Sequence, residues 1–233
     1  MAANLPAQRV SKPRHSAEWW RSKFKRVYEA DQCFPGAMYA LLRSADEVLG
    51  SGFCAKNELS DVSRRLGYRK GSSTGAHAGL RNPFRHYLST YGLTYREEIG
   101  PSDAFQHLKD LVASPTSSHP LVSVRLGFAS AADPSTDIVG TPSDEDHVIV
   151  ILEIEDNTVE FFDATSHPEL HGSPDSSEKA PVDTLLRFWA ANTPEPFLRG
   201  WVEMAPRKTA RQKVKGKSPR RTLESFSVYG GAR

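Results

Sequence analysis

Residues 146–165, DHVIVILEIEDNTVEFFDAT, decide the fold class of this chain. Their first half is a nearly continuous run of β-branched and aliphatic residues, and TVEFFDAT follows after a short polar turn at Asp156 and Asn157. Runs of this kind are typical of buried strands, and a short turn between two of them predicts an antiparallel hairpin. The stretches HPLVSVRLGF at 119–128 and FLRGWVEMA at 197–205 predict two further strands.

Helical periodicity dominates the chain before this hairpin, up to about residue 115. Ser16 is the predicted N-cap of the first helix, and Gly50 or Gly52 is the predicted end of the second. The predicted helices cover 17–30, 34–50, 57–71, 78–92 and 102–114, the last with a Ser N-cap, and a late helix covers 181–192. The Ser-, Pro- and Asp-rich segments 128–146 and 172–180 are predicted to be surface loops. Helices followed by an antiparallel sheet predict an α+β fold.

Length and composition favour a soluble protein. A chain of 233 residues can bury a core without disulfides or a structural metal. Apolar residues make up 38% of it, in runs far shorter than the roughly 20 residues of a membrane-spanning helix. The first 20 residues lack the apolar segment of a secretory signal. We therefore expect a cytoplasmic protein with reduced thiols, no membrane span and no cofactor. No metal is expected either, because His167 and His171 have zinc-like spacing but no clear third ligand.

Charge is distributed unevenly along the chain. Residues 207–221, RKTARQKVKGKSPRR, contain eight Lys or Arg and no acid, which leaves 22 basic against 28 acidic residues elsewhere. We interpret 207–233 as a basic flexible tail and 1–15 as a disordered N-terminus, on either side of one domain at 16–206. The segment 207–221 is a candidate contact for an acidic partner or nucleic acid, although no aromatic residue is interleaved to stack on bases.

Three residues stand in an order that suggests nucleophilic catalysis. Cys33 opens the second helix, His147 begins the first strand of the hairpin, and Asp163 ends the second strand. A helix N-terminus and a nearby imidazole favour the reactive thiolate, and a third group must hold the imidazole in position. A three-residue turn at 155–157 would make His147 and Asp163 diagonal neighbours on one face. A two-residue turn would separate them unless a bulge intervenes.

The order of these motifs resembles that of the papain-like cysteine peptidases, and most closely their bacteriocin-processing branch. The resemblance spans roughly residues 28–205. It rests on a Cys at the start of a helix, the helix LSDVSRRLG, the strand PLVSV, the His-led strand HVIVILEI, the segment FFDAT, a helix with FW and a last strand with Trp. It implies a helical half packed on an antiparallel sheet. It also implies Cys33 as nucleophile, His147 as general base and acid, and Asp163 as the orienting residue.

The residues around the thiol depart from the family pattern. The family usually has Gly after its Cys and an oxyanion-stabilising Gln several residues before it. Here Phe34 follows Cys33, and Gln32 is directly adjacent to it. Gln32, together with the backbone amide of Cys33, is our candidate for the oxyanion hole, ahead of Glu29.

The function expected from these residues is that of a thiol-dependent hydrolase. It would cleave peptide or isopeptide bonds of a protein or peptide substrate through a thioester. The same constellation serves deamidation, transglutamination and acyl transfer, because each begins with thiolate attack. Two other classes stay open: an inactive papain-like fold that binds a peptide, and a nucleic-acid-associated protein that works through its tail. Cys54, in the loop after the Cys33 helix, is expected to be inert.

Overall fold

The computed structural model describes residues 15–23, 32–68, 82–96, 103–114, 118–125, 128, 146–164, 178–190 and 198–204. Residues 1–14 of the predicted disordered N-terminus and the predicted tail at 207–233 lie outside these ranges, as do Glu29, His167 and His171. His15, the last residue of the predicted disordered segment, is described, and its ring stacks on Trp19 with a centroid distance of 3.6 Å. Most residues of the two predicted long loops also lie outside them.

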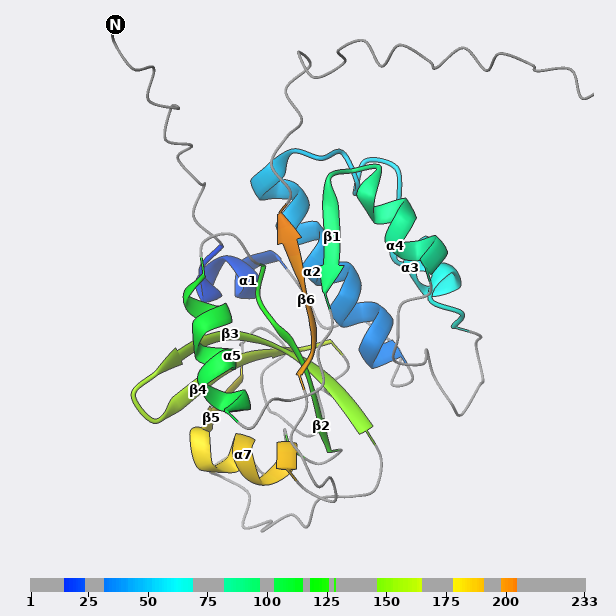
Figure 1. The fold of residues 1–233 in the computed structure, drawn as a ribbon. Helices are drawn as coiled ribbons and strands as arrows, with labels where there is room; N and C mark the ends of the chain where they lie inside the picture. The colour runs from blue at the N-terminus through cyan, green and yellow to red at the C-terminus, as the bar shows by residue number, and fades with distance from the viewer. Residues whose placement is uncertain are drawn as a thin grey trace, which may run out of the picture.

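Six antiparallel strands form one open sheet among the described residues, in the order β1-β6-β2-β3-β4-β5 (Figure 1). The strands are β1 (Leu93–Arg96), β2 (Leu121–Arg125), β3 (Asp146–Glu155), β4 (Thr158–Asp163), β5 (Glu178–Pro181) and β6 (Leu198–Met204). The predicted hairpin is β3 with β4, flanked by β2 and β5. The predicted α+β class with an antiparallel sheet is therefore confirmed.

Helices supply the residues that cover both faces of this sheet. One hydrophobic cluster includes residues of α1 (Ala17–Lys23), α2 (Cys33–Leu49), α3 (Leu59–Arg65) and α4 (Asn82–Ser89), and a second includes residues of α5 (Ala104–Ala113) and α7 (Val182–Ala190). Side chains alternate along β3, so Val148 and Val150 belong to the first cluster and Ile149 and Ile151 to the second. Burial on both faces explains why this run is apolar at consecutive positions.

The central helix α2 carries Cys33 at its first position. Most of its residues are buried, and Met38 and Leu41 are fully inaccessible. Gly50 ends the helix in the left-handed conformation, with a φ of 59°, and donates its N–H to the Asp46 carbonyl at 2.6 Å. The predicted end of the helix is confirmed. Because α2 packs against β3, β4 and β6, its N-terminus is held in a fixed position beside the sheet.

The predicted start of α1 is confirmed, and that of α5 is wrong. The hydroxyl of Ser16 accepts the N–H of Trp19 at 3.3 Å, which is the bond expected of an N-cap. Helix α5 has Asp103 rather than a serine at its N-cap position, and Asp103 makes no side-chain capping bond.

Two strands lie where the sequence predicted helix or loop. The chain before residue 115 is not wholly helical, because Gly92, with a φ of 73°, reverses it after α4 and Leu93 then begins β1. Residues 178–180, predicted as loop, belong to β5 at the edge of the sheet. Pro181 ends β5, and an edge strand tolerates a residue without an N–H.

Phe128, which the sequence placed at the boundary between a predicted strand and a predicted surface loop, is fully buried. Its ring packs on Phe161 and Phe188, with centroid distances of 4.9 and 5.9 Å. Among the described helices, none is long and apolar enough to cross a membrane.

Candidate active site

The turn between β3 and β4 has two residues, Asp156 and Asn157, because Glu155 pairs with Thr158. Asp156 has a φ of 49°, in the left-handed region that aspartate adopts more readily than most residues. The three-residue turn considered from the sequence is therefore wrong. A two-residue turn alone would place the imidazole and the carboxylate on opposite faces of the hairpin.

A bulge in β3 restores the arrangement. The pairing shifts between Ile151 and Glu153, so that Leu152 is the extra residue of this strand. Beyond the bulge, Ile149 pairs with Asp163. His147 is two residues from Ile149, so it lies diagonal to Asp163 on the same face.

His147 and Asp163 form a buried ion pair. Nε2 of His147 donates to Oδ2 of Asp163 at 2.7 Å, and the two side chains are 9% and 2% exposed. Burial disfavours the charged ring, but the Asp163 carboxylate and the Cys33 side chain outweigh burial and raise the pKa of His147 well above its ordinary value. The ring is therefore protonated at neutral pH.

The side chain of Cys33 also acts on this ring, because it is among the groups that raise the pKa of His147. Since Nε2 is bonded to Asp163, Nδ1 is the nitrogen left for the sulfur. The first turn of α2 and the beginning of β3 lie at the same end of the molecule in Figure 1. The structure thus brings Cys33, His147 and Asp163 together in the order thiol, imidazole, carboxylate.

The start of α2 adds a favourable electrostatic environment. Helix α2 is 17 residues long, and its first turn contains no acidic side chain. The partial positive charge of the helix N-terminus therefore acts on Cys33 without a neighbouring carboxylate on that turn to oppose it. Cys33 is partly exposed, so a reagent or substrate has access to it.

Gln32 occupies the N-cap position of α2 and makes no side-chain capping bond. It is partly exposed and lines a groove between α2 and α3. Its amide directly precedes the thiol in sequence.

Cys54 provides a contrast within the same protein. It lies in the loop after α2, where Asp46 accepts the backbone N–H of Phe53 at 3.1 Å and that of Cys54 at 2.9 Å. Burial, together with the Asp46 carboxylate, raises the pKa of Cys54 to about 12. Such a thiol is almost entirely protonated near neutrality, as expected for an inert cysteine.

Sequence reasoning missed the groove beside Gln32, which Ser63 and Tyr68 also line. A signal was present in helix α3. Leu59, Val62 and Leu66 form an apolar stripe at helical spacing, and Ser63 falls inside this stripe, where an apolar residue would be expected.

The chain matches no protein-family model and no curated protein. The arrangement of Cys33, His147 and Asp163 is therefore the basis for assigning a function.

Proposed function

We propose that this protein is a thiol-dependent hydrolase that cleaves peptide or isopeptide bonds, with a papain-like arrangement of residues 16–206. The observation that carries the proposal is the contact order of three side chains. Cys33, at a helix N-terminus, acts on the ring of His147, and Asp163 binds Nε2 of the same ring at 2.7 Å. This is the order in which a nucleophile, a base and an orienting group act.

The first half of the reaction forms a thioester. The Cys33 thiolate attacks the carbonyl carbon of the substrate, a C–S bond forms, and the carbonyl electron pair moves to oxygen. The tetrahedral intermediate then expels the amine, which takes its proton from Nδ1 of His147. A ring that is protonated at neutral pH has this proton available when the leaving group needs it.

The second half hydrolyses the thioester. Neutral His147 takes a proton from water, and the resulting hydroxide attacks the acyl carbon. Collapse of the second intermediate breaks the C–S bond, releases the acid and restores the thiolate beside the imidazolium. Asp163 keeps Nε2 protonated throughout, which directs Nδ1 to the reacting atoms.

The oxyanion of both intermediates needs hydrogen-bond donors. The backbone N–H of Cys33 and the side-chain amide of Gln32 are the groups we assign to it. The support for Gln32 is its position directly before the nucleophile and the absence of a capping bond that would occupy its side chain.

Deamidation, transglutamination and acyl transfer share the thioester and differ in what enters or leaves. A deamidase expels ammonia from a side-chain amide, and a transferase replaces water with an amine or another acceptor. An inactive peptide-binding module would keep the geometry and lose the reactivity of the thiol.

The test is labelling of Cys33 followed by turnover. Iodoacetamide should alkylate Cys33 rapidly near neutral pH, and mass spectrometry of the digested protein identifies the modified residue. Cys33→Ser should abolish hydrolysis of a quenched peptide library while leaving the thermal unfolding midpoint unchanged, because the replacement is nearly isosteric. Cys54→Ser is the matched control and should keep full activity. A Cys33 that reacts no faster than Cys54 would favour the binding module.

A further inference from the structure

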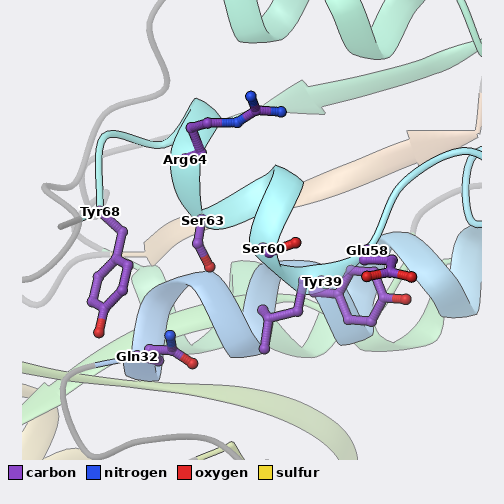
Figure 2. Close-up of a pocket in the computed structure, with 8 residues that line it drawn as sticks. Gln32, Tyr39, Glu58, Ser60, Ser63, Arg64 and Tyr68 are labelled. Atoms are coloured by element: carbon purple, nitrogen blue, oxygen red, sulfur yellow. The ribbon is translucent and has the colours of Figure 1, made fainter. Parts of the chain in front are cut away.

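A groove lies between α2 and α3, beside the N-terminal end of α2 (Figure 2). Its volume is about 660 Å³, which is within the range of small-molecule sites. Gln32, the residue directly before Cys33, lines this groove. A side chain bound in the groove would therefore belong to a residue close to the bond that Cys33 attacks.

Ser63 lines the groove with a buried hydroxyl that has no partner. The residue is 4% exposed, and its Oγ makes no hydrogen bond within the part of the chain that the structure describes. Figure 2 shows this hydroxyl pointing from α3 toward the first turn of α2, where Gln32 lies. Burial of an unpaired hydroxyl is unfavourable, and alanine is a better helix former than serine. A buried polar atom directed into a groove is explained if a ligand supplies its partner.

The groups at this end of the groove are polar and uncharged. Gln32 contributes a carboxamide and Tyr68 a phenol, and both groups can donate and accept hydrogen bonds. The charged residues of the lining are directed elsewhere. Arg64 binds Asp61 at 2.8 Å and points away from α2, and Glu58 lies at the opposite end of the groove (Figure 2).

We propose that this groove binds a carboxamide side chain, that of glutamine or asparagine, in a substrate residue next to the scissile bond. The inference rests on the proposed function, because it needs Cys33 to act on a peptide. A carboxamide carries one acceptor oxygen and two donor hydrogens, so it can pair with Ser63 and with Gln32 or Tyr68 at once.

Other side chains match the groove less well. Among the described lining residues, no cation is directed at the Gln32 end of the groove and no carboxylate lies there, so a substrate carboxylate or a lysine ammonium would lose hydration without a charged partner. An aliphatic side chain would leave the Ser63 hydroxyl unpaired. A comparison of substrates that carry glutamine with substrates that carry its charged isostere, glutamate, is therefore the most decisive test of this groove.

The experiment uses covalent peptide probes that report on Cys33 directly. Peptidyl acyloxymethyl ketones react when the thiolate displaces the acyloxy group, so a C–S bond forms and a carboxylate leaves. Probes with glutamine, glutamate, leucine or lysine at each of the two positions nearest the ketone are compared. Their rate constants for modification of Cys33 are measured by mass spectrometry of the full chain. The glutamine probe should react fastest at one of these positions.

Ser63→Ala tests the assigned contact. We expect a loss of about three- to tenfold in the rate with the glutamine probe, the range for one neutral hydrogen bond, and no change with the leucine probe. Ser60→Ala is the control on the same helix, because Ser60 lines the same groove but is exposed and lies away from Gln32 (Figure 2). Ser63→Ala removes an unpaired polar atom from a buried site, so its unfolding midpoint should equal or exceed that of the wild type. Tyr68→Phe provides a second variant that keeps the ring.

The possible outcomes separate this inference from the proposed function. If Cys33 reacts with iodoacetamide but the probes show no preference for glutamine, or Ser63→Ala loses no more than Ser60→Ala, the carboxamide pocket is refuted and the hydrolase proposal stands. If Cys33 is inert to iodoacetamide as well as to every probe, the proposed function fails and the pocket assignment fails with it.

Discussion

Cys33 and Cys54 should be alkylated at very different rates. The pKa of Cys54 allows its rate to be compared with that of an ordinary exposed thiol. At pH 7, a thiol with a pKa of about 12 has a thiolate fraction of about one in 10⁵, which applies to Cys54. An ordinary exposed thiol, with a pKa of about 8.5, is about 3% thiolate at the same pH. Once deprotonated, the more basic Cys54 thiolate is about 40-fold more nucleophilic than an ordinary thiolate, and this offsets part of the difference in thiolate fraction. An ordinary exposed cysteine should thus react about 100-fold faster than Cys54.

Activation of Cys33 is recognised by how its labelling rate depends on pH, because an ordinary exposed cysteine would also react faster than Cys54. Between pH 8 and pH 6, an ordinary thiol loses about 80-fold of its thiolate, and Cys54 should lose about 100-fold. In the proposed mechanism the His147 ring stabilises a Cys33 thiolate, so the labelling of Cys33 should fall less steeply than this between pH 8 and pH 6. His147→Ala removes the pair, so the labelling of Cys33 should then fall steeply with pH, like that of an ordinary thiol.

The assay is iodoacetamide labelling at pH 6, 7 and 8, with each cysteine followed by its own peptide in the mass spectrometer. Because both thiols are in the same molecule, reagent concentration and protein folding are identical for the two. A Cys33 rate that falls by about 80-fold between pH 8 and pH 6 in the wild type would refute the thiolate–imidazolium pair, and with it the proposed mechanism.

Three further changes test other parts of the structure. Asp163→Asn keeps a hydrogen-bond acceptor but removes its charge, so the pKa of His147, followed by NMR, should fall; an unchanged titration contradicts the ion pair. Because the pKa of His147 is raised in the folded protein, the wild-type ion pair stabilises the protein fully below about pH 6.5 and less as pH rises through that folded pKa. Urea unfolding should show this decline in the free energy of unfolding, and the decline should be smaller in Asp163→Asn. Asp46→Ala removes the acceptor of the Cys54 backbone N–H and one of the two acceptors of the Phe53 N–H, the other being the Ser51 hydroxyl, and should cost about 1–3 kcal/mol in urea unfolding. A loss below about 0.5 kcal/mol would show that water replaces the carboxylate. Gly200→Ala places a Cβ against the Arg96 carbonyl and the Tyr95 ring, so it should lower the unfolding midpoint by several degrees; equal midpoints would mean that β6 moves freely.

The hairpin and the Cys33 helix were predictable because their signals are local. A run of β-branched residues and a helix that ends at Gly50 are properties of neighbouring residues in the chain. Strands β1 and β5 were not predictable in the same way. Each has only four residues, and β1 pairs with a strand more than 100 residues later, Leu93 with Met204. Their strand character comes from the partner, which no short window of sequence contains.

The candidate site was partly predictable for a related reason. The identity of Cys33, His147 and Asp163 followed from residue chemistry and position. The Ser63 hydroxyl was overlooked because a serine in an amphipathic helix is unremarkable until its burial is known. Whether a buried hydroxyl finds a hydrogen-bond partner depends on the neighbouring helix, and the position of that helix is set by tertiary packing.

The bulge at Leu152 shows how function constrains the hairpin beyond its pattern of hydrophobicity. The number of residues between His147 and Asp163 allows them to share a face only if one residue is left out of the pairing, in the turn or in a strand. The two-residue turn uses the left-handed conformation of Asp156, so the spare residue falls in β3. Leu152 can absorb it without exposing apolar surface, because its side chain stays 3% exposed in the first hydrophobic cluster. A strand with one polar face would show such a bulge as a break in alternation. In β3 both faces are buried up to Leu152, so the bulge leaves no mark in this run of apolar residues, although the meeting of imidazole and carboxylate depends on it.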